Sequence, residues 1–294
     1  MYDSSAPKPN VPWWTGPSAF ALVVLLLFVF SLVLRILMSV YDPQAVAAAL
    51  GSPQSMIIQV LVMSAVFSFL AAAVPSVFRV SPSQWLHLSK VSPRVVIAAA
   101  VGVTGLGFWV DELVFLLHSI DPVFFDASGL DTFNRLFISA PSAVFVLLSV
   151  AVTLGPGIGE ELFFRGLVLR SLVGAASPAA AVGISSILFG IVHFDVLQSP
   201  GAALIGVYLG TVALRTGSLL PSMAAHGINN LTCALFARFS DPTAPTPVDV
   251  GHPIPLLAAA AAVFAVASVL LFRWTDSGPP DDPKIPPQGR DLSR

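Results

Sequence analysis

Long apolar segments recur along almost the whole chain, and they restrict it to structures that can lie in lipid. The 294 residues are 55% hydrophobic and only 10% charged, whereas soluble domains carry about 25% charged residues. About 20 apolar residues are enough for a helix to cross a bilayer, and a helix satisfies its own backbone hydrogen bonds there. We therefore predict an all-α, polytopic membrane protein.

The apolar segments predict eight transmembrane helices. They lie near residues 18–40, 56–79, 94–118, 142–172, 178–197, 201–215, 217–238 and 254–273. The flanking residues are polar and rich in proline, a composition that does not support a packed core. We expect a cytoplasmic lead-in at 1–17, an eight-helix domain at 18–273 and a disordered cytoplasmic tail at 274–294.

Lys and Arg residues are distributed unevenly between alternate loops. With the N-terminus inside, eleven of the 14 fall on the inner side, and cytoplasmic loops carry the excess of positive charge in membrane proteins. Both termini are therefore expected in the cytoplasm. The net charge of −2 gives no reason to expect a nucleic acid partner, and the single cysteine allows no disulfide within the chain.

One stretch, GPGIGEELFFRG at residues 155–166, places charged side chains inside an apolar segment. Charged residues within a membrane are costly and indicate a functional site. Glu161 and Arg165 are four residues apart, so they share a helical face and can pair. Glu160 points about 100° away from Glu161 and stays free for chemistry. The glycines and proline of residues 155–159 predict a break in the helix, which at membrane depth must be buried in protein or line a wet cavity.

Two further polar clusters lie in separate apolar segments. Phe189 and His193 are four residues apart, as are His226 and Asn230, so each pair shares a helical face. Counted from the predicted cytoplasmic ends of their helices, Glu160, His193 and His226 lie roughly 18, 22 and 14 Å deep. The three clusters can therefore meet in one layer near the middle of the membrane.

A carboxylate, two imidazoles and an amide in such a layer suit hydrolysis. A carboxylate helped by an imidazole can take a proton from water, and neutral His and Asn side chains can stabilise an oxyanion. Histidine and carboxylate ligands also suit a catalytic zinc ion, although the HExxH signature is absent. The spacing leaves both mechanisms open.

The order EExxxR, FxxxH and HxxxN, each on its own apolar segment, resembles the CPBP family of intramembrane endopeptidases, the CAAX-processing and bacteriocin-processing proteases also called the Abi family. The resemblance covers a motif core at residues 140–238. It implies an endopeptidase that cleaves a membrane-associated protein or peptide, lipidated or not, in contact with membrane lipid. The bacterial inner membrane is the location we expect.

The resemblance also implies a role for each catalytic residue. Glu160 would activate water with the help of His193, while His226 and Asn230 would stabilise the oxyanion of the tetrahedral intermediate. The preferred mechanism needs no metal or other cofactor. If the enzyme depends on zinc, Glu160, His193 and His226 would be the ligands.

Other polar residues receive supporting roles or none. The resemblance implies that Glu161 and Arg165 orient and brace the site, and Phe189 is expected to pack beside it. Asp111 and Glu112 lie in the middle of the third predicted helix. They either reach an outer cavity or have a function that the sequence does not indicate.

Two other classes of function stay open at this stage. The first is a non-catalytic membrane protein that binds a peptide, as an immunity or scaffold factor. The second is a secondary transporter that uses the buried carboxylates as a proton relay. The order of the motifs favours the protease over either class.

Overall fold

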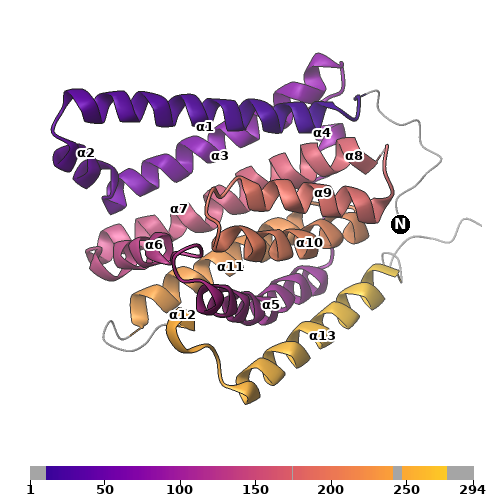
Figure 1. Ribbon diagram of the computed structural model, residues 1–294. Coiled ribbons are helices and arrows are strands. Elements are labelled where there is room, and N and C mark those ends of the chain that lie inside the picture. The colour runs from indigo at the N-terminus through magenta and orange to yellow at the C-terminus, as the bar shows by residue number, and fades with distance from the viewer. Residues whose placement is uncertain (1–10, 174, 241–246, 277–294) are drawn as a thin grey trace, which may run out of the picture.

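The computed structural model describes residues 11–173, 175–240 and 247–276 and folds them into a bundle of long helices (Figure 1). No strand occurs within these ranges, so the all-α prediction is confirmed. The helix α1 begins and the helix α13 ends at the same end of the bundle (Figure 1). The described helices, in chain order, are α1 (Thr15–Val40), α2 (Pro43–Leu50), α3 (Pro53–Val77), α4 (Pro82–Trp85), α5 (Pro93–Ile120), α6 (Ser128–Ser139), α7 (Ser142–Glu160), the π-helix η1 (Glu161–Leu169), α8 (Arg170–Val173), α9 (Pro178–Ile191), α10 (Gln198–Thr216), α11 (Leu220–Phe239), α12 (Pro247–Val250) and α13 (Ile254–Asp276).

Each of the eight predicted apolar segments corresponds to a helix, but not every helix qualifies as a membrane span. Five helical stretches of the described chain are long and apolar enough to cross a membrane: α1, α3, α5, the continuous run from α7 to α8, and α13. The 14 residues of α9 extend only about 21 Å, less than the hydrocarbon core of about 30 Å. The count of eight transmembrane helices is therefore not confirmed.

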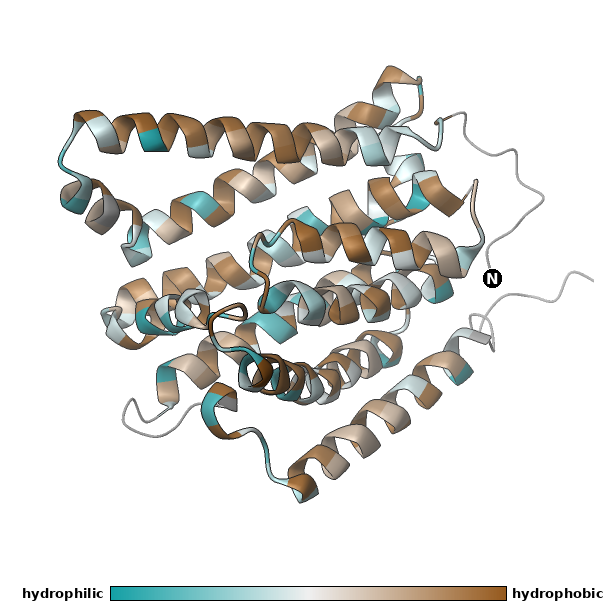
Figure 2. Cartoon of the chain, in the orientation of Figure 1, coloured by the Kyte–Doolittle hydropathy of each residue, from teal (hydrophilic) through white to brown (hydrophobic). Residues whose placement is uncertain are grey.

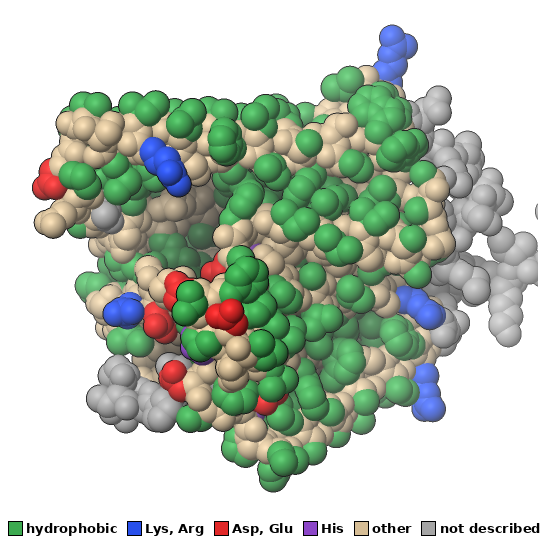
Figure 3. Space-filling model, in the orientation of Figure 1, with side chains coloured by type: hydrophobic (Ala, Val, Ile, Leu, Met, Phe, Trp, Pro, Cys, Tyr) green, Lys and Arg blue, Asp and Glu red, His purple; other side chains and the backbone are tan. Residues whose placement is uncertain are grey.

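The surface supports an integral membrane protein. Hydrophobic residues run along the long helices in Figure 2, and hydrophobic side chains are spread over the face shown in Figure 3. Large residues on α1 such as Phe28 and Phe30 are more than half exposed. Extensive exposed apolar surface of this kind indicates contact with lipid. Acidic side chains gather around α6, and several basic side chains lie at the end of the bundle where α13 ends (Figure 3).

The predicted lead-in and tail lie mostly outside the described residues. Residues 1–10 and 277–294 belong to that part of the chain. Within the described residues, α1 already begins at Thr15 and α13 continues to Asp276. Helix α1 therefore begins before the predicted end of the lead-in at residue 17. Helix α13 continues past residue 274, where the tail was predicted to begin.

The predicted helix 178–197 is wrong at its C-terminal end, because α9 ends at Ile191. A turn follows, and Asp195 within it accepts hydrogen bonds from two backbone amides at the start of α10, each 2.9 Å long. This side chain satisfies amides that a helix N-terminus would otherwise leave unpaired. His193 therefore lies in the turn between α9 and α10, not in a helix.

The predicted break at residues 155–159 is also wrong, because α7 continues through these residues to Glu160. The glycines serve close helix packing instead. A Cβ on Gly159 would lie 2.7 Å from the Cα and carbonyl oxygen of Ser64 in α3, and a Cβ on Gly157 would lie 3.2 Å from the backbone of Gly227 in α11. Small residues of this kind let membrane helices approach closely.

The π-helix η1 occupies the centre of the bundle. It contacts α1, α3, α7, α8, α9, α10 and α11. Its side chains Phe163 and Phe164 are fully buried, and the ring of Phe67 in α3 lies 4.9 and 5.7 Å from their ring centroids. Short π-helices are rare and occur often at functional sites, so this segment directs attention to the residues it carries.

We predict that Gly159→Ala destabilises the protein by about 1–3 kcal/mol, because the added methyl group overpacks the contact with α3. The matched control is Gly183→Ala, since a Cβ there meets no atom within 4 Å. The control should unfold at the wild-type temperature or slightly above it, because Ala favours a helix over Gly by about 1 kcal/mol. Thermal unfolding in detergent measures both variants, and equal melting temperatures for the two would contradict the packing argument.

Candidate active site

A buried carboxylate, Glu161, is the hub of the site. Its side chain is 0% exposed, and its Oε1 accepts hydrogen bonds from Nη1 of Arg165 at 2.6 Å and from Nδ1 of His226 at 2.9 Å. Arg165, itself 1% exposed, also donates to the carbonyl oxygen of Gly206 in α10 at 3.2 Å. The predicted pairing of Glu161 with Arg165 is present, and it extends to two further helices.

His226 of α11 lies between the two adjacent glutamates. Its Nδ1 donates to Glu161, because a carboxylate oxygen is the acceptor. The other ring nitrogen, Nε2, faces Oε2 of Glu160 at 3.9 Å, which is too long for a direct hydrogen bond. The Glu160 side chain is 16% exposed, and its Oε2 has no hydrogen-bond partner among the described residues.

The ring of Phe189 in α9 contacts several members of the site. The guanidinium carbon of Arg165 lies 4.4 Å from its centroid, in a cation–π arrangement. The imidazoles of His193 and His226 meet the ring at 5.1 and 5.7 Å, nearly perpendicular to it, as aromatic pairs prefer. Phe189 was predicted to pack beside the site, and the structure places it between the residues that form it.

His193 is close to the site but not bonded to its carboxylates. Its Nδ1 donates to the backbone oxygen of Phe189 at 2.8 Å, and this bond leaves Nε2 as the free ring nitrogen. Within the described chain, no hydrogen bond or ion pair joins His193 to Glu160 or His226. Its assistance to Glu160 therefore stays a prediction.

Asn230 lies one helical turn beyond His226 on α11. Its amide nitrogen donates to the backbone oxygen of Val152 in α7 at 3.0 Å, so it holds α11 against α7. An Asn amide carries two N–H donors, and this bond uses one of them. The predicted contribution of Asn230 to an oxyanion hole can rest only on the second.

The predicted zinc ligands, Glu160, His193 and His226, are not arranged as a metal site. In residues 11–173, 175–240 and 247–276, no group of three or more His, Cys, Asp or Glu side chains could hold a metal ion. Nδ1 of His226 is bonded to Glu161, and Nδ1 of His193 is bonded to a backbone oxygen. No step through a metal follows from this arrangement.

Asp111 and Glu112 of α5 contact His252, in the segment that precedes α13. Oδ2 of Asp111 lies 3.5 Å from Nε2 of His252, and Oε2 of Glu112 accepts a hydrogen bond from its backbone N–H at 2.9 Å. The two carboxylates therefore hold this segment against α5. The sequence offered no signal for the pairing, because 140 residues separate Glu112 from His252.

A family of known proteins matches the part of the chain that carries the site. Residues 142–232 match the family described as type II CAAX prenyl endopeptidase Rce1-like. The matched range contains every predicted site residue, and it confirms the resemblance to the CPBP and CAAX protease family. No curated protein and no solved structure matches the chain.

We predict that Arg165→Met lowers the free energy of unfolding by about 3–5 kcal/mol, because it leaves the buried carboxylate of Glu161 without its cation. The matched control is Arg135→Met, which breaks an exposed pair with Asp131 at the same four-residue spacing. Exposed pairs contribute about 0–1 kcal/mol. Thermal unfolding of both variants measures the difference, and a small loss for Arg165→Met would show that the buried pair is not needed for folding.

Proposed function

We propose that this protein is an intramembrane endopeptidase that hydrolyses a peptide bond in a membrane-associated protein or peptide of the CAAX type. The family match and the five apolar spans support this class of activity. One observation carries the mechanism: an unpaired carboxylate oxygen of Glu160 faces the free ring nitrogen of His226 at 3.9 Å. A base without a partner beside an oriented imidazole is suited to activate water.

The gap between these two atoms fits one water molecule. Hydrogen bonds of about 2.8 Å from the water to each atom would meet at an angle of about 90°. In the proposed reaction, Glu160 accepts a proton as the water oxygen attacks the scissile carbonyl carbon. The proton then passes to the peptide nitrogen as the C–N bond breaks, so the products are a carboxylic acid and an amine.

Oxyanion stabilisation is assigned to His226 and Asn230. Glu161 orients the imidazole through Nδ1, so Nε2 points at the space where water and substrate would meet. If Nε2 receives from Glu160 the proton removed from water, the imidazole can donate a hydrogen bond to the developing negative charge until that proton passes to the leaving nitrogen. The second N–H of Asn230 is the other proposed donor.

Glu161 and Arg165 are proposed as positioning residues. Their contacts to one another and to His226 are fully buried, where a charge pair is retained only with good geometry and further hydrogen bonds. Phe189 supports the same arrangement through its ring. His193, whose Nε2 is free, is proposed to assist from the edge of the site.

We further propose that the reaction requires no metal or other cofactor, with zinc dependence as the alternative. The substrate, lipidated or not, would reach the site from the lipid or from the cytoplasm. The proposed setting is the bacterial inner membrane, with both termini in the cytoplasm. The positive charges on alternate loops support this orientation.

We predict that Glu160→Gln lowers peptide cleavage by about 10²-fold or more, since a general base contributes about 10²–10⁴-fold. Purified protein in liposomes is incubated with prenylated and unprenylated CAAX peptides, and mass spectrometry measures the products. The matched control is Glu112→Gln, which replaces a glutamate outside the site by a side chain that can still accept its hydrogen bond. A Glu160→Gln variant as active as wild type would overturn the mechanism.

The same assay separates the remaining alternatives. Activity that survives a strong chelator would support the metal-free mechanism, whereas activity lost to the chelator and restored by zinc would support the metallopeptidase. A non-catalytic peptide-binding protein would bind the peptides without cleaving them and would tolerate Glu160→Gln. A transporter would show proton-coupled flux in the same liposomes without cleaved product.

A further inference from the structure

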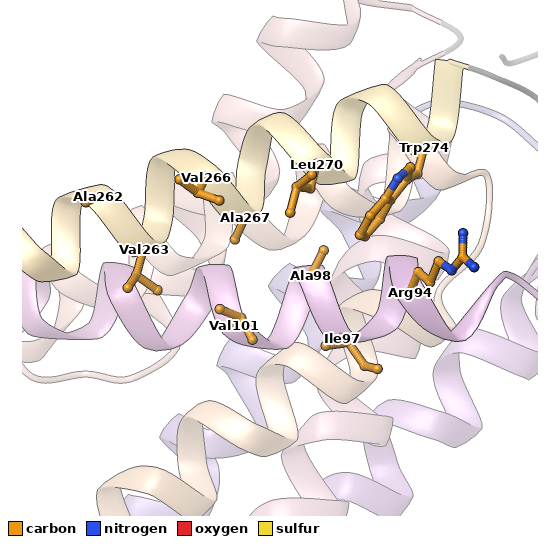
Figure 4. A pocket seen from close by; sticks show the side chains of 10 residues that line it. All are labelled: Arg94, Ile97, Ala98, Val101, Ala262, Val263, Val266, Ala267, Leu270 and Trp274. Carbon is orange, nitrogen blue, oxygen red and sulfur yellow. The ribbon is translucent and has the colours of Figure 1, made fainter.

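An open apolar groove of about 700 Å³ runs between α5 and α13, at the side of the bundle (Figure 4). Aliphatic side chains such as Ile97, Val101 and Val266 form its walls. Two larger groups, the guanidinium of Arg94 and the indole of Trp274, lie at one end (Figure 4). The groove is therefore apolar along its length and cationic at its end.

Small residues shape the groove. Ala98 and Ala267 are buried at its base, while Ile97 and Val266 are 62% and 59% exposed at its rim. Beyond the groove the two helices touch closely, since a Cβ on Gly105 would lie 2.8 Å from the carbonyl oxygen of Ala260. This contact holds α5 and α13 close together beyond one end of the groove. Towards the other end, at Arg94 and Trp274, the groove stays open.

The groove has the length of one leaflet. The α13 residues that line it extend from Ala262 to Trp274, which corresponds to about 18 Å of helix. Half of a hydrocarbon core of about 30 Å is about 15 Å. One acyl chain of a phospholipid therefore fits along the groove from the headgroup level towards the middle of the bilayer.

The polar end of the groove suits an anionic headgroup. Arg94 is exposed and has no hydrogen bond or ion pair within the described chain. Arg273, next to Trp274, lies at the same end and is also exposed. Tryptophan prefers the membrane interface, and basic residues there attract anionic lipids.

We propose that this groove binds one phospholipid with an anionic headgroup, with an acyl chain between α5 and α13 and the phosphate on Arg94. Charge complementarity favours this occupant. A second copy of the chain or an uncharged prenyl chain would use the apolar walls but leave the guanidinium without a partner. The proposal is independent of the proposed peptidase activity.

The test is native mass spectrometry of the full-length, delipidated protein titrated with phosphatidylglycerol or phosphatidylcholine. We expect one phosphatidylglycerol to bind more tightly than phosphatidylcholine. Arg94→Gln should weaken phosphatidylglycerol binding about fivefold, the effect of one basic residue near a membrane surface. It should weaken phosphatidylcholine binding less, because the choline cation offsets the charge of that phosphate, while Val266→Trp, which fills the groove, should weaken both.

The control is Arg35→Gln, which removes another exposed arginine, on α1, without touching the groove. It should leave both affinities unchanged. Equal binding of the two lipids by wild type, or an unchanged affinity in Arg94→Gln, would overturn the proposal. Displacement of the lipid by a prenylated peptide equally in wild type and Arg94→Gln would assign the groove to substrate instead, and dimers that replace the lipid adduct would assign it to a second copy.

Discussion

The architecture of the site depends on one buried carboxylate. A charge removed from solvent costs several kcal/mol unless it is paired and hydrogen-bonded, and Glu161 meets this requirement through Arg165 on its own π-helix and His226 on α11. Arg165 in turn bonds to the backbone of α10 and stacks on the ring of Phe189 in α9. The contacts that stabilise this buried charge therefore also join η1, α9, α10 and α11. They orient the imidazole of His226 so that its Nε2 faces Glu160.

Close packing of the helices brings the side chains of these contacts within bonding distance of one another. Between membrane helices there is little hydrophobic driving force, so association relies on small residues and polar bonds. Gly157 and Gly227 bring α7 and α11 into backbone contact, and Gly206 lets α10 lie against α9. Without these approaches, the short distances from Glu161 to Arg165 and His226 could not coexist with the aromatic contacts of Phe189. Stability and the geometry of the site are thus properties of one packed unit.

Much of the fold could be predicted, and the errors have identifiable causes. Hydropathy located a helix for each of the eight apolar segments, because burial in lipid imposes continuous apolar runs. The break expected at residues 155–159 is absent, since tertiary contacts with α3 and α11 compensate for the low helix propensity of glycine. The helix expected to reach residue 197 ends at Ile191, because the turn before α10 is stabilised by the side chain of Asp195. Composition cannot distinguish an apolar turn from an apolar helix.

The all-α membrane architecture, the pairing of Glu161 with Arg165 and the set of polar residues within the family match could be read from the amino-acid sequence, because these depend on composition and on spacing along one helix. Which carboxylate His226 binds follows instead from the packing of the helices. Glu161 and His226 are 65 positions apart in the sequence, and this separation carries no information about the relative rotation of η1 and α11. That rotation results from packing of the glycines and aromatic rings between the helices, and it gives the Nδ1 hydrogen bond of His226 to Glu161 while Nε2 faces Glu160.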